Sequence, residues 1–223
     1  MDPYVYPGTD VLKNKFDLRT ESQLVQVEYL ITDLRTKAGL PKVSLNYDGF
    51  RALHRHLFQD IYAWAGEERT VDMQKGSSVF CRSSYISENM NTRFCVLKNE
   101  NSLKGLSRED FAERAAEHIS EINAVHPFRE GNGRTQMLFL ARLGQEAGYY
   151  INLEKLAERK ERWLEASIAG MATDYSKMRE LLLDITEPLV RSPEKQQARS
   201  SEKAAIATKK RRRDTEKDHD LSR

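Results

Sequence analysis

The sequence predicts an all-α helical bundle that carries one short β-hairpin. Apolar residues recur every three or four positions in successive segments between residues 20 and 185, as in helices with one buried face. A single stretch, residues 70–80, breaks this period and places a glycine between two short apolar groups. The chain has 223 residues, of which 39% are hydrophobic and 31% charged. One sizeable globular domain with appendages is therefore expected.

The first predicted helix spans residues 20–38, within an N-terminal helical extension over residues 1–40. Gly39 follows the periodic segment and is a typical helix stop. The apolar residues at helical spacing are Leu24, Val27, Leu30, Ile31 and Leu34. We expect this face to pack against the rest of the domain.

A second helix is predicted over residues 48–64, and Ala65-Gly66 ends it. His54 and His56 both lie in this helix. Because they are two positions apart, they face different sides, which makes a shared metal site improbable. We interpret both histidines as structural.

The stretch over residues 70–80 predicts the β-hairpin. Val71 and Met73 precede a polar segment, Val79-Phe80 follows it, and Gly76 supplies the turn. Taken alone, this pattern is also compatible with an ordinary surface hairpin.

The remaining elements are helical. Ser107 is a predicted N-cap, His126-Pro127 breaks the helix that Ser107 starts, and Gly148 stops the helix after it. Glu187-Pro188 closes the domain. These helices are predicted over residues 85–98, 107–125, 134–145, 153–170 and 174–185.

The run His126-Pro127-Phe128-Arg129-Glu130-Gly131-Asn132-Gly133-Arg134 concentrates chemistry between two predicted helices. Gly131 and Gly133 let the backbone approach a ligand closely. The first N–H groups of a helix have no intrahelical partner and bind anions. Arg134 adds a forked cation suited to phosphate oxygens.

Two further groups in this run complete a site for nucleotide chemistry. Glu130 is a hard oxygen ligand, and Mg²⁺ in proteins is often held by one carboxylate together with substrate phosphates. His126 titrates near neutral pH and can take a proton from an attacking hydroxyl. A lone His-Pro turn or a lone Gly-Asn-Gly loop would be structural, but the combination predicts attack on a nucleotide phosphate.

The pattern His-x-Phe-x-Glu-Gly-Asn-Gly-Arg resembles the signature of the Fic family, which mostly transfers AMP from ATP to a hydroxyl of a target protein. Other segments resemble bacterial Fic toxins and effectors, so the similarity covers roughly residues 2–187. They are the N-terminus from Asp2 to Leu12, the stretch from Leu57 to Gly66, and the stretch from Glu121 to Phe128. The resemblance implies a Fic-fold helical bundle whose β-hairpin is a flap beside the active-site loop.

The resemblance implies a role for each residue of the signature. His126 would be the catalytic base, Phe128 would anchor the loop in the core, and Glu130 would bind Mg²⁺. The nucleotide-binding residues would be Lys75, Gly76, Gly131, Asn132, Gly133 and Arg134. The flap that docks the target would include Val71, Asp72, Met73, Gln74 and Lys75. Flap and target would pair by strand addition.

Two positions in the signature bear on the activity. Doc-type relatives carry lysine where this chain has Gly131 and transfer a terminal phosphate, so Gly131 favours transfer of AMP from ATP. The family pattern places a second arginine at position 137, where this chain has Met137. Met137 predicts weaker ATP binding or slower turnover unless another arginine, such as Arg82 or Arg142, substitutes in space. The alternative is a Fic-fold binding or regulatory module with weakened catalysis.

The resemblance also implies partners. The target would be a protein with a Ser, Thr or Tyr hydroxyl, and relatives include toxins that modify type II topoisomerases and effectors that modify small GTPases. Many members are silenced by a helix with the pattern Ser/Thr-x-x-x-Glu-Gly/Asn, which Ser176-x-x-x-Glu180 followed by Leu181 fits poorly. We therefore expect a separate antitoxin-like partner, or no such control. The chain would act as the toxin of a toxin–antitoxin pair or as an effector delivered into a host cell by a secretion system.

The charge distribution separates a body from a tail. Residues 191–223 hold eleven Lys/Arg and six Asp/Glu, a net of +5, which leaves −3 for residues 1–190 from the whole-chain charge of +2. We expect a Fic domain over residues 1–190, with its core at about 48–186, and a disordered basic tail. The densest basic run is Lys209-Lys210-Arg211-Arg212-Arg213. Beyond weak contacts of this tail, no binding of nucleic acid is expected.

The compartment follows from what the sequence lacks. No apolar run approaches the ~18 residues that a membrane span requires, and the polar start from Met1 to Gly8 is unlike a signal peptide. Cys81 and Cys95 are the two cysteines, without the spacing of a disulfide framework or zinc site. Free thiols in a reducing cytosol are expected.

Overall fold

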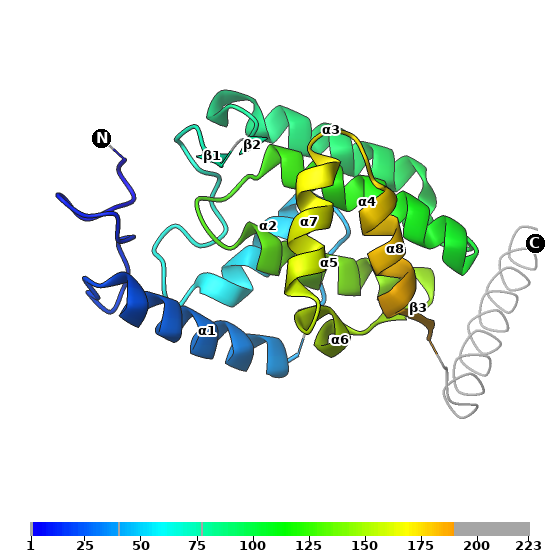
Figure 1. The fold of residues 1–223 in the computed structure, drawn as a ribbon, viewed down its shortest axis with the longest axis horizontal. Helices are drawn as coiled ribbons and strands as arrows, with labels where there is room; N and C mark the ends of the chain where they lie inside the picture. Colours follow the sequence, from blue (N-terminus) through cyan, green and yellow to red (C-terminus); the bar gives the residue numbers. More distant parts are fainter. Residues whose placement is uncertain (1, 40, 77, 190–223) are drawn as a thin grey trace, which may run out of the picture. The chain divides into compact units, whose positions relative to one another are not determined.

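The computed structural model describes residues 2–39, 41–76 and 78–189, and it confirms the helical class (Figure 1). The α-helices are α1 Glu21–Lys37, α2 Tyr47–Phe58, α3 Ile86–Asn99, α4 Arg108–Val125, α5 Asn132–Ala147, α6 Leu153–Ala157, α7 Lys160–Gly170 and α8 Ser176–Ile185. Short 3-10 turns lie at Ser83–Tyr85 and Asn101–Leu103. The strands are β1 Gln74–Lys75, β2 Ser78–Val79, β3 Tyr149–Ile151 and β4 Thr186–Pro188. The basic tail predicted over residues 191–223 lies outside the described residues.

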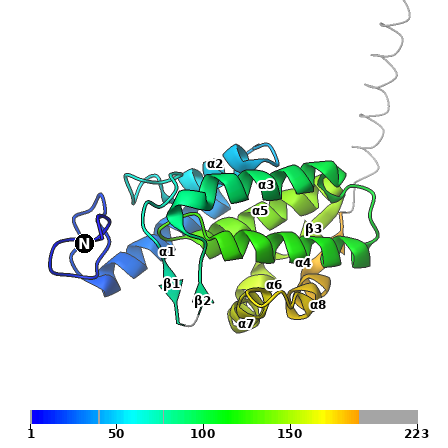
Figure 2. The same cartoon turned by 90° about the horizontal axis from the view of Figure 1, so that it is seen from above.

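Helix α4 is the centre of the bundle. It packs against α3, α5, α7 and α8, while α2 packs against α1 and α5. Figure 2 shows α7 and α8 along one side of α4, with α2, α3 and α5 on the other. In the core, the buried ring of Phe50 lies 5.6 Å from that of Phe128 and 5.5 Å from that of Phe139. The active-site loop is thus attached to the core through Phe128.

Local sequence explains several helix ends. The Asn46 side chain accepts a hydrogen bond from the Gly49 N–H at the start of α2, and Ser107 accepts one from the Asp110 N–H at the start of α4. At the end of α5, Gly148 has a φ of 97°, a conformation that glycine adopts without strain. None of the helices in the described ranges has the length and apolar character of a membrane span.

Two predicted helices have the wrong extent, and one small sheet was not predicted. The helix expected over residues 48–64 ends at Phe58, because the chain then turns and still buries Ile61 and Tyr62. The helix expected over residues 153–170 is divided into α6 and α7. Strands β3 and β4, which no pattern indicated, pair antiparallel with Ile151 opposite Thr186. Short three-residue strands give too little alternation to be recognised.

Helix α1 forms as predicted but buries a different face. Its buried residues are Leu24, Glu28 and Thr32, whereas Leu30 and Leu34 are 59% and 66% exposed. Glu28 is buried because it faces an arginine of the active-site loop, and Thr32 is buried with its hydroxyl bonded to the Glu28 carbonyl. Partnered polar groups therefore replace the apolar stripe on the inner face.

Candidate active site

The loop between α4 and α5 has two left-handed residues at its ends. His126 ends α4 with a φ of 52° and ψ of 63°, and its N–H donates to the Ile122 carbonyl. Gly131 precedes α5 with a φ of 82°. A Cβ at Gly131 would lie 2.3 Å from ring carbons of Phe58, so this position requires glycine for packing as well as for φ.

The first turn of α5 offers backbone donors. The first intrahelical bond of this helix joins the Thr135 N–H to the Gly131 carbonyl at 3.0 Å, so the earlier N–H groups of Gly133 and Arg134 precede the bonded part of the helix. The buried Asn132 side chain instead holds the loop: Oδ1 accepts from the Phe128 N–H at 2.9 Å and Nδ2 donates to the Phe128 carbonyl at 2.7 Å. Among the predicted nucleotide-binding residues, Asn132 can therefore contact a ligand through its backbone only.

The Glu130 carboxylate suits a magnesium ion that is shared with substrate phosphates. Its side chain is 44% exposed, and Oε1 accepts from the Gly131 N–H at 2.8 Å. Within the described ranges, no group of three or more His, Cys, Asp or Glu side chains could hold a metal without such oxygens. The residues present thus fit Mg²⁺ held by one carboxylate, phosphate oxygens and water.

Arg134 lies between two carboxylates, one of which the motif does not include. Its Nη2 is 2.7 Å from Glu28 Oε2 and 3.2 Å from Glu130 Oε1, and the guanidinium lies 4.6 Å from the centre of the Phe58 ring. The Tyr62 hydroxyl donates to the other Glu28 oxygen. Glu28, on α1, therefore fixes the orientation of Arg134.

His126 is held as a neutral base. Its ring stacks on Phe80 at 3.8 Å, and Nδ1 lies 3.3 Å from the Asn123 carbonyl oxygen. Because a carbonyl can only accept, Nδ1 carries the proton and Nε2 keeps its lone pair. Burial lowers the pKa of His126 to about 4. The ring is therefore unprotonated at neutral pH and can accept a proton.

His54, predicted to be structural, supports the loop from behind. The Gly66 N–H donates to Nδ1 at 2.8 Å, so the Nε2–H donates to the Glu130 carbonyl, 2.9 Å away. The ring also stacks on Phe128 at 3.8 Å. Burial lowers the pKa of His54 to about 3.

These two histidines predict an acid-sensitive fold. In the unfolded chain both take up protons as the pH falls through about 6.5, whereas in the folded protein the pKa of His126 is about 4 and that of His54 about 3. The unfolded state therefore binds more protons between pH 6.5 and 4. As the pH is lowered through this window, we expect the free energy of unfolding to decrease by up to about 1.4 kcal/mol per pH unit for each histidine.

Urea unfolding at pH 7 and pH 5 measures this loss, and NMR titration of the two ring Cε1–H signals measures its cause. We expect both signals to stay constant from pH 8 to pH 5. A midpoint near 6.5 for either ring would contradict the assignment.

The buried side chain of Arg69 joins the flap, residues 71–80, to the loop between α4 and α5. It is 1% exposed, and Nε donates to the His126 carbonyl at 2.8 Å. Its other nitrogens donate to the carbonyls of Val71, Cys81 and Val125. No pattern in the sequence indicated a role for Arg69, apart from its place between a helix stop and a predicted hairpin. Arg69 thus fixes the position of the two ends of the flap relative to the backbone of His126.

We expect Arg69→Lys to keep the charge but lose most of these bonds, because an ammonium cannot reach four carbonyls with the fork of a guanidinium. Unfilled buried acceptors should lower the free energy of unfolding by roughly 1 to 3 kcal/mol. Urea unfolding measures this, with the exposed Arg55→Lys as a control. Equal stability of the two variants would contradict the role of Arg69.

The predicted flap residues lie beside this centre. β1 and β2 pair as an antiparallel hairpin with Gly76 at a φ of 58° in the connection. Burial lowers the pKa of His126, and the charges of Arg69 and Lys75 lower it further. A cleft of about 440 Å³ at the base of the flap is lined by Asp2, Val71, Asp72, Met73, Gln74 and Arg129.

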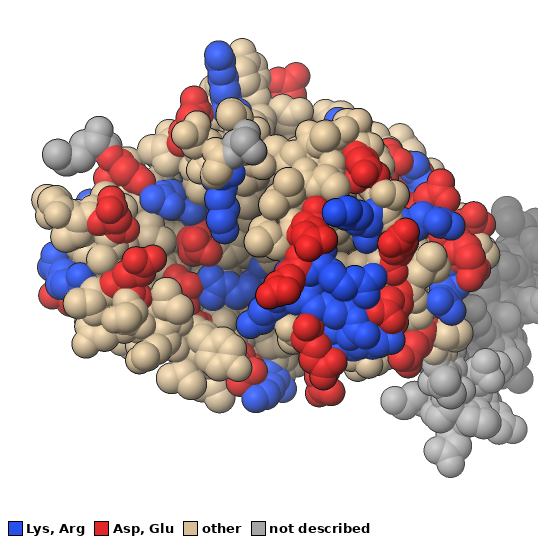
Figure 3. All heavy atoms as spheres, in the orientation of Figure 1, with Lys and Arg blue, Asp and Glu red and all other residues tan. Residues whose placement is uncertain are grey.

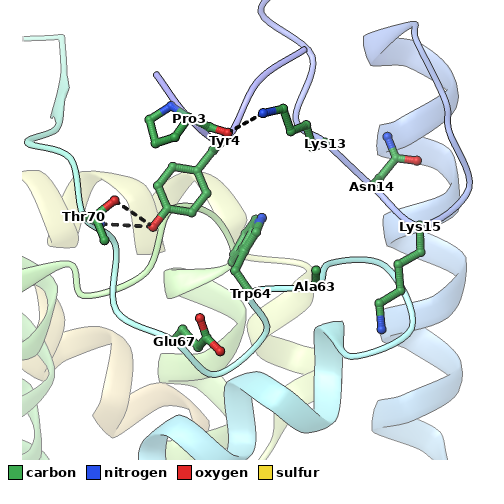
Figure 4. A pocket seen from close by; sticks show the side chains of 9 residues that line it. All are labelled: Pro3, Tyr4, Lys13, Asn14, Lys15, Ala63, Trp64, Glu67 and Thr70. Atoms are coloured by element: carbon green, nitrogen blue, oxygen red, sulfur yellow. Dashed lines mark hydrogen bonds between the residues drawn. The ribbon is translucent and has the colours of Figure 1, made fainter. Parts of the chain in front are cut away.

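The N-terminal arm connects the loop and the flap. Asp2 binds Arg129 through two nitrogens at 2.8 and 3.0 Å. The Tyr4 hydroxyl accepts from the Thr70 N–H at 3.0 Å, and its ring meets Trp64 edge-on at 5.6 Å beside a pocket of about 410 Å³ (Figure 4). The arm therefore forms one wall of the flap cleft.

A second cleft, of about 500 Å³, opens beside α1 and the loop. It is lined by residues of α1, by Glu130 and Arg134 of the loop, and by Lys160 at the start of α7. Figure 3 shows a hollow on this face with charged side chains around it. Met137 packs half-buried against the core. Arg142, which binds Glu146 at 2.5 Å, and Arg82 are not among the described residues that line the cleft.

Comparison with known proteins agrees with this geometry. The family model described as Fic/DOC family matches residues 44–144. The chain is 42% identical over 176 residues to the "Probable protein adenylyltransferase y4lH" of Sinorhizobium fredii, covering 78% of this chain and 91% of that protein. It is 37% identical over 183 residues to the "Probable protein adenylyltransferase Fic" of Escherichia coli K12, covering 78% and 87%.

A solved structure extends the similarity to the fold. The VirB-translocated effector BepC of Bartonella tribocorum, with bound AMPPNP, superposes with a TM-score of 0.77 at 28% identity, covering 83% of this chain and 96% of that one. Matching sequence, fold and loop together show that this chain belongs to the Fic/DOC family.

Proposed function

We propose that this protein is an adenylyltransferase that transfers AMP from ATP to a hydroxyl group of another protein. The observation that carries the proposal is the position of His126, a neutral base with a free Nε2, between a flap and a helix N-terminus that presents backbone donors. Similar proteins named adenylyltransferases support it.

The chain's residues divide the reaction between them. The target segment binds along the flap, and its hydroxyl donates its proton to His126 Nε2 as the oxygen attacks the α-phosphorus of ATP. The new oxygen–phosphorus bond replaces the bond to the β-phosphate, and pyrophosphate leaves. The N–H groups of Gly133 and Arg134 and the Arg134 guanidinium stabilise phosphate charge. Mg²⁺ held by Glu130 would offset the charge of the phosphates.

The direct test uses purified protein, Mg²⁺ and cell lysates with α-labelled and γ-labelled ATP in parallel. We expect label on a protein from α-labelled ATP alone, and no label with His126→Ala. Label from γ-labelled ATP would indicate phosphoryl transfer. No label from either would favour the alternative, a binding module weakened by Met137.

The biological setting is part of the same proposal. We propose that the chain modifies a protein in the cytoplasm, either of the cell that makes it or of a host cell. The similarity to VirB-translocated effectors supports delivery to a host. Labelling in a bacterial lysate but not in a eukaryotic one would instead support a toxin, with a separate inhibitory partner. Within this chain, the poor match to the inhibitory pattern, Ser176 and Glu180, lies on α8, which packs on α4 and α7.

A further inference from the structure

We propose that Lys160 binds the outer phosphates of ATP, and that it supplies the cation that the first turns of α5 lack beyond Arg134. The inference rests on the proposed function, because it assumes that the cleft beside Arg134 receives a nucleoside triphosphate.

The charges of the cleft make an additional cation necessary. Its lining includes four carboxylates, those of Asp10, Glu21, Glu28 and Glu130, and three cations. A triphosphate brings further negative charge, which a site with an excess of carboxylates repels. Mg²⁺ held by Glu130 would offset part of this charge, and the cations of the cleft would offset the rest.

Two of the three cations are already paired. Arg129 binds Asp2 at 2.8 Å, and Arg134 is shared between Glu28 and Glu130. Lys160 is exposed and forms no hydrogen bond or ion pair with any residue in the described ranges. Its ammonium is therefore the cation of this cleft that is free to meet a ligand.

The fold directs Lys160 toward the anion-binding turn. Lys160 is the first residue of α7, and Trp163 stands three positions later, on the same face of the helix. The Trp163 Nε1 atom lies 4.0 Å from where a Cβ of Gly133 would be. This face of α7 thus lies over the first turn of α5, where backbone N–H groups without an intrahelical partner can bind a phosphate.

No other side chain of α5 provides this charge close to Arg134. Thr135 and Gln136 are buried, and Met137 is uncharged. The next arginine of the helix, Arg142, is paired with Glu146. The outer phosphates are therefore bound by Lys160 of α7 instead of by a second cation on α5.

The test compares the binding of AMPPNP and of AMP, both with Mg²⁺, by calorimetry. In Lys160→Met we expect the Kd for AMPPNP to rise about tenfold and the Kd for AMP to stay unchanged. Lys160→Arg should keep most of the affinity for AMPPNP. Lys98→Met removes an exposed lysine on α3 that does not line the cleft, and it should change neither Kd.

Unchanged AMPPNP binding in Lys160→Met, or an equal loss for AMP and AMPPNP, would overturn the inference. Because binding is read without transfer, the two proposals fail separately. Lys160-dependent binding without labelled protein would leave the inference standing and remove the proposed function. Labelled protein together with Lys160-independent binding would support the proposed function and overturn the inference about Lys160. A wild-type protein that binds no AMPPNP would overturn both.

Discussion

His126→Ala is expected to reduce the rate of AMP transfer by about a thousandfold or more while ATP binding stays within about twofold. A positioned general base contributes about 10² to 10⁴ to a rate, and the expected loss lies within this range. The ring stacks on Phe80 of the flap, and His126 is not among the described residues that line the cleft of Glu130 and Arg134, so we expect nucleotide affinity to change little.

Single-turnover transfer with α-labelled ATP measures the rate, and calorimetry with AMPPNP measures the affinity. His56→Ala is the matched control, because the His56 ring bonds to the Arg35 carbonyl on the neighbouring helix and His56 does not line the cleft of Glu130 and Arg134. A His126→Ala variant that keeps more than a tenth of the wild-type rate would show that another group takes the proton.

Gly131→Ala is expected to lower the free energy of unfolding by roughly 2 to 5 kcal/mol. A φ of 82° costs a residue with a Cβ about 1 to 2 kcal/mol. Overpacking adds about 1 to 3 kcal/mol, because the new atom would lie 2.3 Å from the buried Phe58 ring, which Tyr62 and His54 hold by stacking.

Gly133→Ala is the matched control for this prediction. It adds the same methyl group two positions later, where the nearest atom outside the helix is Trp163 Nε1 at 4.0 Å. Thermal unfolding should show a melting temperature lower by roughly 5 to 15 °C for Gly131→Ala and little change for Gly133→Ala. Equal melting temperatures would mean that the Phe58 ring can move aside for the new methyl group without loss of stability.

The active-site loop could be predicted from sequence because its parts are contiguous. His126, Gly131 and Arg134 lie within nine residues, and the helices on both sides have clear ends. The His-Pro break and the glycines therefore fix where the base and the free N–H groups must lie. The bundle class was equally accessible, since periodic apolar residues report on helices directly.

Residues that support this loop from a distance could not be found in this way. Glu28 is 106 positions from Arg134, and Arg69 is 57 positions from His126. No local pattern relates such pairs, which only the packing of α1 and the flap brings together. The same packing explains why Leu30 and Leu34 on α1 are exposed although their spacing indicated burial. Periodicity locates an apolar face but does not reveal that a buried carboxylate is needed on another.

Transfer of AMP is measured most directly by mass spectrometry of a modified target after reaction with an equal mixture of light ATP and ATP with a heavy-isotope adenine. We predict a doublet with the mass of AMP on a Ser, Thr or Tyr peptide, absent with His126→Ala. A phosphate adduct without the doublet, or no adduct from a protein that binds AMPPNP, would contradict it.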